Sequence, residues 1–400
     1  MRPIAITGVG CVTPLGVTQQ FWENLLAARN AFSSCSLSPR HFRPRAAIFA
    51  AKMEAFRPAT LLGEKGLRTV SYDSQLFASA AVLACQKANL EPKSWNRSEV
   101  GVLVATATAG LNDYTDLVLD ALTYGIDRIE PAQGPQTGFN GPAAQFSIRY
   151  GAEGPNVTML AGASSTLEML DYGAFLVHEK RANVIVAGSV DVLPSLAGLA
   201  SKRSMSESPS GTARPFDRHR DGYIIGESAA AFVLETSANA GSRNAGVIAE
   251  IAGSGTAFRA EVSEANLPNA AERAIAECLR DSSLDASDID VVFASAAGDR
   301  VSDAAEARAL ATIFGDQVPV CAIKGAIGEC LSASAGLQVA AAVLSLQTGR
   351  IPPTAGFQER DPALPQLCIT TKPLHRRLRN ALVHGMDGGR SSALLIRAAQ

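Results

Sequence analysis

The residues from Gly154 to Leu170 form the stretch best suited to present a reactive side chain. Their sequence, GPNVTMLAGASSTLEML, is typical of a buried strand, a tight turn of small residues and a helix. Such elbows commonly carry nucleophiles, because the first-turn N–H groups and the helix dipole favour developing negative charge. The apex residue here is Ala163, which has no nucleophilic group. Ser164 and Ser165 follow it, and we interpret them as helix-start residues whose hydroxyls satisfy backbone donors.

A second group of candidates lies later in the chain. Glu329 and Asp387 are placed to share a cleft, where one carboxyl pKa would be raised and the two would form an acid–base pair. Cys330 directly follows Glu329, but its direction at a helix start differs from that of an elbow apex, so we interpret it as structural. His384 is interpreted as an ordinary loop histidine.

The elements that would position these residues occur twice in the same order. Such internal duplication predicts two pseudo-equivalent α/β lobes, residues 1–243 and 244–400, with parallel-rich sheets covered by helices. Active sites of open α/β folds lie at the carboxyl ends of strands, so the two elbows should face a common cleft. The corresponding segments are 4–10 with 247–253, the helix 71–89 with 267–279, the strand 100–109 with 289–296, and 154–170 with 318–329 and its helix through 348.

Three further segments qualify this outline. Gly8-Val-Gly10 resembles half of a dinucleotide-binding fingerprint, but the third glycine and the later acidic residue are not in place, which disfavours a nucleotide site. Residues 131–142 are rich in Gly, Pro and Gln and are predicted to form a loop. Residues 237–245 are predicted to mark the boundary between the lobes.

The composition excludes several classes of function. The chain has 400 residues, 47% of them hydrophobic and 18% charged, with a formal net charge of −2, which gives no argument for nucleic acid or a membrane surface. Seven cysteines show no metal spacing, no apolar run reaches about 18 residues, and no signal-peptide core is present, so we expect a cytoplasmic protein without metal. The basic clusters 218–220 and 375–379 are solvated faces or docking sites for a phosphate-bearing or acidic partner.

Four motifs give the whole chain a resemblance to the β-ketoacyl synthases, which are thiolase-fold condensing enzymes. They are ITGVGCVTPLG (6–16), the 154–170 stretch, ARPFDRHRDGYIIGESAAAFVLE (213–235) and IKGAIGECLSASAG (323–336). The resemblance implies an α/β, thiolase-like fold of two pseudo-duplicated lobes in a layered αβαβα architecture.

The resemblance also assigns the reactive positions. In that family an elbow Cys takes the acyl chain as a thioester, and two His side chains help to decarboxylate malonyl-carrier and stabilise the oxyanion. By motif, these three positions fall on Ala163, Ser295 and Glu329. The nucleophile and both imidazoles are therefore replaced together, which indicates that the site no longer serves condensation.

Other positions of the family site are altered or kept. The gating loop, usually Gly-Phe-Gly-Gly, becomes Met386-Asp-Gly-Gly389, with Asp387 where the Phe belongs. Lys324, Asp303 and Glu306 are retained, and we interpret them as one structural charge network.

What the resemblance implies is a non-catalytic subunit of the chain-length-factor, or KS-beta, type. Such a subunit pairs with an active ketosynthase and shapes its acyl tunnel during polyketide, polyene or fatty-acid-like elongation. It binds no cofactor, whereas its partner uses acyl- and malonyl-phosphopantetheine carrier protein. Well-known chain-length factors carry Gln where this chain has Ala163, which favours a divergent system such as those making polyenes, including aryl polyenes. The candidate residues of the tunnel and dimer interface are Leu111, Tyr114, Gln136, Thr137, Phe139 and Asn140.

Two alternatives belong to other classes of protein. One is an enzyme with a rearranged site, either a malonyl-carrier decarboxylase or an acyltransferase, that uses Glu329 or Asp387. The other is a homodimeric acyl-binding scaffold.

Overall fold

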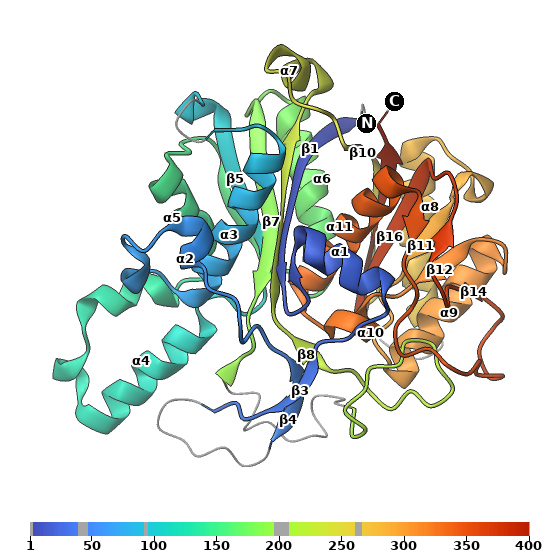
Figure 1. The fold of residues 1–400 in the computed structure, drawn as a ribbon, viewed down its shortest axis with the longest axis horizontal. Coiled ribbons are helices and arrows are strands. Elements are labelled where there is room, and N and C mark those ends of the chain that lie inside the picture. The colour runs from blue at the N-terminus through green and yellow to red at the C-terminus, as the bar shows by residue number, and fades with distance from the viewer. Residues whose placement is uncertain (1–2, 39–46, 92–94, 196–207, 261–265, 400) are drawn as a thin grey trace.

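The two halves of the chain build one continuous sheet with helices on both of its faces (Figure 1). The computed structural model describes residues 3–38, 47–91, 95–195, 208–260 and 266–399. The strands are β1 (Ile4–Thr13), β2 (Gly16–Val17), β3 (Phe32–Cys35), β4 (Ile48–Ala51), β5 (Val100–Ala105), β6 (Asn156–Met159), β7 (Val184–Asp191), β8 (Ile225–Gly226), β9 (Ser228–Glu235), β10 (Ala249–Phe258), β11 (Val291–Phe293), β12 (Pro319–Cys321), β13 (Arg350–Ile351), β14 (Cys368–Ile369), β15 (Leu374–His375), β16 (Asn380–Asp387) and β17 (Arg390–Ala398). The helices are α1 (Thr18–Leu26), α2 (Ala59–Leu62), α3 (Tyr72–Lys87), α4 (Leu111–Tyr124), α5 (Gly141–Tyr150), α6 (Ser165–His178), α7 (Ser237–Ser242), α8 (Leu267–Ser282), α9 (Arg300–Phe314), α10 (Lys324–Ile327) and α11 (Ser332–Thr348).

The strand order confirms the duplication that the sequence predicts. The order is β14-β12-β11-β16-β17-β10-β1-β9-β7-β5-β6. Outward from β1, the strands β9 and β7 follow in antiparallel pairing and β5 and β6 in parallel pairing. Outward from β10, the strands β17 and β16 pair antiparallel and β11 and β12 pair parallel. Each half is therefore built on the same plan, and β1 and β10 meet in the middle.

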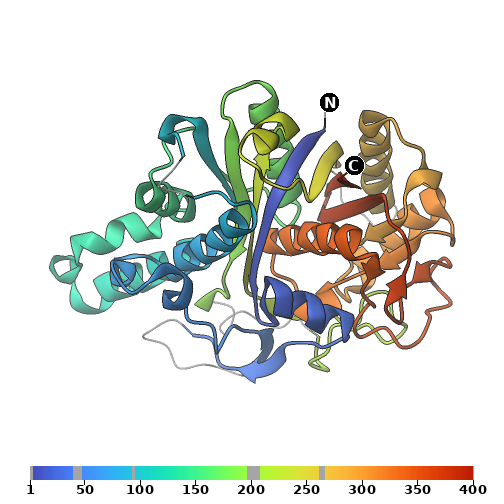
Figure 2. The same cartoon turned by 45° about the horizontal axis from the view of Figure 1, so that its top comes forward.

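The layers follow from how the two halves separate. Strands β1 and β10 pair through only three residues each, Ile4–Ile6 with Ala249–Ile251. Helices α6 and α11 contact strands of both halves and each other, so they form the layer between them (Figure 2). Helix α3 covers the outer face of the first half, and α8 covers that of the second. The result is a thiolase-like α/β fold with helical layers outside and between two sheet layers.

The paired glycines of the N-terminal strand serve helix packing. A Cβ on Gly8 would lie 2.0 Å from the carbonyl oxygen of Ala84 in α3, so only glycine lets the helix approach this closely. Gly255 in β10 repeats this arrangement, because a Cβ there would lie 2.2 Å from the carbonyl oxygen of Ala274 in α8. The Gly-Val-Gly motif is thus explained without a nucleotide.

Some local predictions were wrong. Strand β6, predicted to be buried, is the last strand of its sheet, and its residues are half-buried or exposed. The stretch predicted as a loop at 131–142 contains a 3-10 helix, Pro131–Thr137, and the start of α5. The short helix α7 lies within the segment 237–245, and the lobe boundary placed there stays a prediction. Within the described residues, no helix is long and apolar enough to cross a membrane.

Candidate functional site

The predicted elbow lies between β6 and α6. Gly162 has φ +79° and accommodates the turn, and a Cβ at this position would lie 1.8 Å from Oδ2 of Asp387. The next residue, Ala163, is buried, and α6 begins at Ser165. The chain therefore has the backbone of a nucleophile elbow with a methyl group at its apex.

The backbone donor of the apex is occupied by the chain itself. The N–H of Ala163 donates to Oδ2 of Asp387 at 2.9 Å, although the two residues are 224 positions apart. Asp387 is exposed at the end of β16, where the tight turn to β17 brings it over the elbow. Its carboxylate takes the position at the start of α6 where the helix dipole favours negative charge.

The two serines of the elbow do not act as predicted. The hydroxyl of Ser165 donates to the carbonyl oxygen of Gly162 at 2.6 Å, and that of Ser164 donates to Oε1 of Glu168 at 3.4 Å. Both serines therefore satisfy acceptors and not the free N–H groups of the helix start. Glu168 is also bound by Arg390, at 2.8 Å, so its charge is already compensated.

Glu329, in the second elbow, is held by three donors. Lys324 Nζ lies 2.7 Å from its Oε2, and the N–H of Leu331 and the hydroxyl of Ser334 each donate to Oε1 at 2.9 Å. The Lys324 side chain is 2% exposed and that of Glu329 14%, so both charges depend on this pairing. Ser334 was not among the sequence candidates, because nothing in its local pattern marks it as a partner of Glu329.

Ser295 connects the two sides of the site. Its Oγ accepts hydrogen bonds from Lys324 Nζ at 3.3 Å and from the N–H of Met386 at 3.1 Å. Through these contacts the structure joins Ser295, Lys324 and Glu329, while Asp387, next to Met386, reaches Ala163. The structure therefore places Ser295 and Glu329 on one lysine and Asp387 on Ala163, and none of Ala163, Ser295 and Glu329 carries an imidazole or a thiol.

The retained residues Lys324, Asp303 and Glu306 were predicted to form one charge network, but in the described chain no hydrogen bond or ion pair joins any two of them directly. Glu306 lies opposite Nδ1 of His384 in an ion pair or hydrogen bond and accepts the N–H of Ser295 at 2.7 Å, whereas Lys324 pairs with Glu329. His384 is fully buried on β16, so its interpretation as a loop histidine was also wrong.

Asp303 fixes the backbone around the site. It accepts hydrogen bonds from the N–H groups of Phe216 at 2.8 Å, Ala297 at 3.0 Å and Gly298 at 3.1 Å. Burial raises the pKa of Asp303 to about 7, against the opposing effect of these donors. The residue ties the loop before β8 to the start of α9 and contacts neither Lys324 nor Glu329.

The other proposed reactive groups are also accounted for by structural contacts. Glu329 is bound to Lys324 and Asp387 to Ala163, so the predicted acid–base pair between the two carboxyls does not form. Cys330 is buried, its Sγ lies 3.5 Å from the carbonyl oxygen of Ile327, and burial raises its pKa. A thiol in this environment stays protonated and unreactive. Among the residues that the structure describes, no group of three or more His, Cys, Asp or Glu is placed to hold a metal ion.

The 213–235 motif closes the loop beside the site. Asp217 accepts the N–H groups of Gln358 and Glu359, each at 2.7 Å, and Arg220 pairs with Asp361 at 2.6 Å. Arg218 pairs with Glu359 as well. The first basic cluster of the sequence is therefore compensated within the chain, which removes it as a docking site for an acidic partner.

The residues predicted to line a tunnel lie on one projecting arm of the molecule. Figure 1 shows α4 standing away from the body below α5. The arm comprises α4 and residues 125–140, and its two parts pack closely, since a Cβ on Gly110 would lie 2.7 Å from the carbonyl oxygen of Thr137. Tyr114 is 55% exposed and Phe139 45%. Leu111, Gln136 and Thr137 are half-buried, and Asn140 is exposed.

The first half of the sheet ends in a strand that has a partner strand on only one side in the described chain. Strand β6 pairs with β5 on one side and has no strand on its other side in the described chain. Leu160, which follows it, is 49% exposed, and Tyr172 and Phe175 of α6 stack on each other while 38% and 44% exposed. We call β6 with Leu160 the β6 edge. Exposed apolar side chains next to an open strand are typical of a surface that another chain covers.

Family models and relatives of known sequence both match the β-ketoacyl synthases. The family model "Beta-ketoacyl synthase, N-terminal domain" matches residues 1–240, and "Beta-ketoacyl synthase, C-terminal domain" matches residues 246–358. The tetracenomycin polyketide synthase ketoacyl synthase alpha subunit of Streptomyces glaucescens is 29% identical over 99% of this chain and 97% of its own length.

Two solved structures share the fold. The ishigamide ketosynthase/chain length factor aligns with a TM-score of 0.90 at 22% identity, over all of both chains. A type II polyketide synthase complex of an acyl-carrier protein with its ketosynthase, AntDE:AntF, aligns with a TM-score of 0.87 at 22% identity, again over all of both chains. At this identity the structural likeness establishes the fold alone.

Proposed function

This chain belongs to the β-ketoacyl synthase family, and we propose that it serves there as a non-catalytic subunit of the chain-length-factor type. In this proposal it pairs with an intact ketosynthase and forms part of the wall of the tunnel in which the partner elongates an acyl chain. The acyl and malonyl groups arrive on the phosphopantetheine arm of a carrier protein, which the partner uses. The chain itself supplies shape and no reactive group.

The observation that carries this proposal is the state of the elbow. Condensation requires a nucleophile at the apex and donors that receive the developing oxyanion. At this apex Ala163 offers no nucleophile, and its N–H is already bound to Asp387 at 2.9 Å. The two positions that hold imidazoles in the family carry Ser295 and Glu329, and both are engaged with Lys324. Each polar group that could act on a substrate is committed to another part of the chain.

The pairing is supported by the surface next to the elbow. An open strand exposes unpaired N–H and C=O groups, and pairing with a second strand satisfies them. At the β6 edge these groups adjoin the exposed side chain of Leu160, and the aromatic pair on α6 is exposed as well. A chain that lacks catalytic groups at its elbow and exposes an apolar, unpaired strand edge is suited to bind a partner subunit along that edge.

Co-expression with the ketosynthase encoded nearest to this chain tests the pairing. The proposal predicts a 1:1 complex by size exclusion with mass analysis, and poor recovery of this chain when it is expressed alone. A stable homodimer of this chain that remains when the ketosynthase is present would favour the acyl-binding scaffold instead. Turnover of malonyl-carrier by this chain alone, lost on Glu329→Gln, would favour the enzyme with a rearranged site.

The role in the tunnel is tested at Phe139. Its side chain is 45% exposed on the projecting arm, and in this proposal it enters the partner's acyl pocket. We expect Phe139→Ala to change the length of the product without dissociating the complex, because it removes bulk and leaves the β6 edge intact. Tyr124→Ala, on the same arm and 62% exposed, is the matched control and should leave product length unchanged. Unchanged products across several substitutions in 134–142 would refute the tunnel role.

The product class is proposed from the apex residue. Because this chain has Ala163 where well-known chain-length factors have Gln, we infer a divergent type II system, of the kind that makes polyenes or aryl polyenes. Mass analysis of the products of the reconstituted complex tests this assignment. Conjugated polyene acyl chains would support it, and poly-β-ketone chains that cyclise to aromatic products would overturn it.

A further inference from the structure

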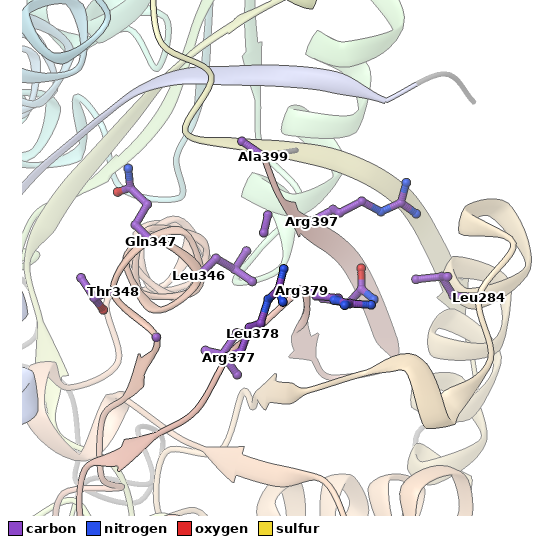
Figure 3. A pocket seen from close by; sticks show the side chains of 12 residues that line it. Leu284, Leu346, Gln347, Thr348, Arg377, Leu378, Arg379, Arg397 and Ala399 are labelled. Atoms are coloured by element: carbon purple, nitrogen blue, oxygen red, sulfur yellow. The ribbon is translucent and has the colours of Figure 1, made fainter.

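The second basic cluster of the sequence, unlike the first, lies at a hollow in the surface. The hollow has a volume of about 830 Å³ and lies between the end of α11, the segment that leads into β16, and the end of β17. All three of Arg377, Arg379 and Arg397 line it, and Figure 3 shows Arg377 and Arg379 near Leu346 of α11, with the side chain of Arg397 extending from β17 toward the side of Leu284. We call this hollow the arginine cleft.

The guanidinium groups of the arginine cleft are not used by the fold. Arg376, the neighbour of Arg377, lies 3.7 Å from Asp290, but no ion pair or hydrogen bond joins the guanidinium groups of Arg377, Arg379 or Arg397 to another described residue. This contrasts with Arg218 and Arg220, both of which are paired. Three unpaired guanidinium groups therefore line one hollow, where a bound anion would compensate their charge.

Nearby carboxylates offset only part of this charge. Oδ2 of Asp290 accepts the backbone N–H groups of Arg379, at 2.6 Å, and Asn380, at 3.0 Å, and its Oδ1 lies 3.7 Å from the guanidinium group of Arg376. Glu250 of β10 lies opposite Arg397 in the β10–β17 pairing. The C-terminal end of α11 also favours positive charge close to it. These groups explain why basic residues are tolerated here, but they leave the three guanidinium groups without a bound anion.

The rest of the lining adds an apolar floor and a buried acceptor. Leu346 and Leu378 are 8% and 4% exposed, and both line the cleft. Asn380 also lines it, and its Oδ1 is buried with no hydrogen-bond partner, while its Nδ2 donates to the carbonyl oxygen of Asp288 at 3.0 Å. An unpaired buried acceptor is costly and is satisfied by a ligand that brings a hydroxyl or amide donor.

The arginine cleft is separate from the elbow. Strand β16 starts with Asn380 at the cleft and ends with Asp387 at the elbow, seven residues away, or about 23 Å at 3.3 Å per residue. Helix α11 spans the same interval, from Ser332, whose hydroxyl donates to the carbonyl oxygen of Gly162, to Thr348 at the cleft. Its seventeen residues extend about 25 Å. A ligand in the cleft therefore cannot touch the degenerate centre.

We propose that the arginine cleft binds a small phosphorylated molecule, with its phosphates on Arg377, Arg379 and Arg397 and its apolar or ring portion on Leu346 and Leu378. The volume is that of a site for a small ligand. Guanidinium groups pair with phosphate through two parallel hydrogen bonds, which a lone surface charge does not provide. The concave, partly apolar lining favours a small phosphate ester over the flat acidic surface of a protein. This inference is independent of the function proposed above.

Calorimetric titration at low salt, with ADP and with inorganic tripolyphosphate as probes, tests the proposal. The protein used is the full chain, in its complex if it requires one. We expect saturable 1:1 binding of ADP, weakened at least tenfold by the triple change Arg377→Gln, Arg379→Gln and Arg397→Gln. The matched control changes three exposed arginines that lie elsewhere, Arg181→Gln, Arg273→Gln and Arg308→Gln, and should bind ADP as the original chain does.

The outcomes separate the parts of the proposal. Tighter binding of ADP than of tripolyphosphate supports the apolar floor and the Asn380 acceptor, and equal binding overturns that part. Equal loss of affinity in both triple variants would show an effect of net charge only and would overturn the site. Absence of saturable binding of either probe to the original chain, with unchanged thermal unfolding of all three proteins, would also overturn it.

Discussion

Polar groups at the elbow site have hydrogen-bond partners within the chain, whereas backbone groups at the edge of the sheet lack a partner strand in the described chain. At the centre the residues at the reactive positions are bound within the chain, with Ala163 N–H on Asp387 and Glu329 on Lys324. At the β6 edge, β6 has no neighbouring strand on one side within the described chain, and Leu160 is exposed. A catalytic subunit needs unsatisfied donors at its centre to receive a transition state. Here the unpaired backbone groups of the described chain lie at the β6 edge, and this contrast supports the proposed pairing with a second chain.

The largest expected effect comes from placing a charge on the open edge. We expect Leu160→Asp to weaken the complex with the ketosynthase at least a hundredfold, because a buried unpaired carboxylate costs about 3 kcal/mol or more in an apolar interface. Val301→Asp, at a comparably exposed apolar position on α9, is the matched control and should bind normally. Sedimentation velocity or surface binding measurements give both affinities. Equal affinity of the two variants would place the interface elsewhere.

The next prediction concerns how much the ion pair of Lys324 and Glu329 stabilises the fold. Glu329→Leu leaves Lys324 as a buried, unpaired charge, and we expect it to lower the free energy of unfolding by about 3–5 kcal/mol. Lys324→Met combined with Glu329→Leu should recover most of that loss, because the pair is then replaced by apolar groups of similar size. Urea unfolding of the original chain, of Glu329→Leu and Lys324→Met alone, and of the double variant completes the cycle. A double variant as unstable as Glu329→Leu alone would contradict the pairing.

A smaller effect concerns the pH dependence of the scaffold around the centre. The pKa of Asp303 is raised from 3.8 to about 7 by burial, so its contribution to stability is fully present below about pH 3.8 and is lost as the pH rises through 7. Asp303→Asn does not titrate, so its cost relative to the original chain should be about 2–3 kcal/mol smaller at pH 8 than at pH 5. Urea unfolding of both proteins at pH 5 and pH 8 measures this difference in the free energy of unfolding. A cost that grows with pH would mean that the N–H donors of Phe216, Ala297 and Gly298 keep the carboxylate ionised.

The smallest effect is expected from restoring the missing thiol. Ala163→Cys should give no condensation activity, because the two positions that hold imidazoles in the family carry Ser295 and Glu329 and the carboxylate of Asp387 faces the apex. Adding Asp387→Ala should speed alkylation of this cysteine by iodoacetamide on the order of tenfold, since removing a negative charge lowers the thiol pKa by about one unit. Mass spectrometry against time gives both rates. Condensation by Ala163→Cys alone would show that the elbow site can still support catalysis despite the contacts of Asp387, Ser295 and Glu329.

Much of the fold could be predicted from the sequence, because its patterns are local. The buried strands, the glycine turn before Ala163 and the repeated order of elements each follow from neighbouring residues. Strand order is not local, and so β6 was predicted to be buried although it lies at the edge. A hydrophobic run cannot tell a strand that is covered by its own chain from one that another chain would cover.

The motifs identified the residues of the candidate site but not their hydrogen-bond and ion-pair partners. The family motifs placed Ala163, Ser295 and Glu329 together, and the structure brings their neighbourhoods into contact. The contact of Asp387 with Ala163 spans 224 residues, and His384 with Glu306 spans 78, so neither has a sequence signature. For the same reason the retained charges were predicted as one network, whereas tertiary packing assigns each carboxylate a different partner.

The most direct test of the account is a condensation assay on the purified complex with the ketosynthase, using malonyl-carrier and an acyl primer. One form changes only the elbow cysteine of the partner to alanine, and the other changes only Glu329→Gln in this chain. We predict that the first form is inactive and that the second retains its rate, because the proposed function assigns all the chemistry to the partner. Activity that survives loss of the partner's cysteine, or that disappears with Glu329→Gln in a complex that remains assembled, would contradict the account.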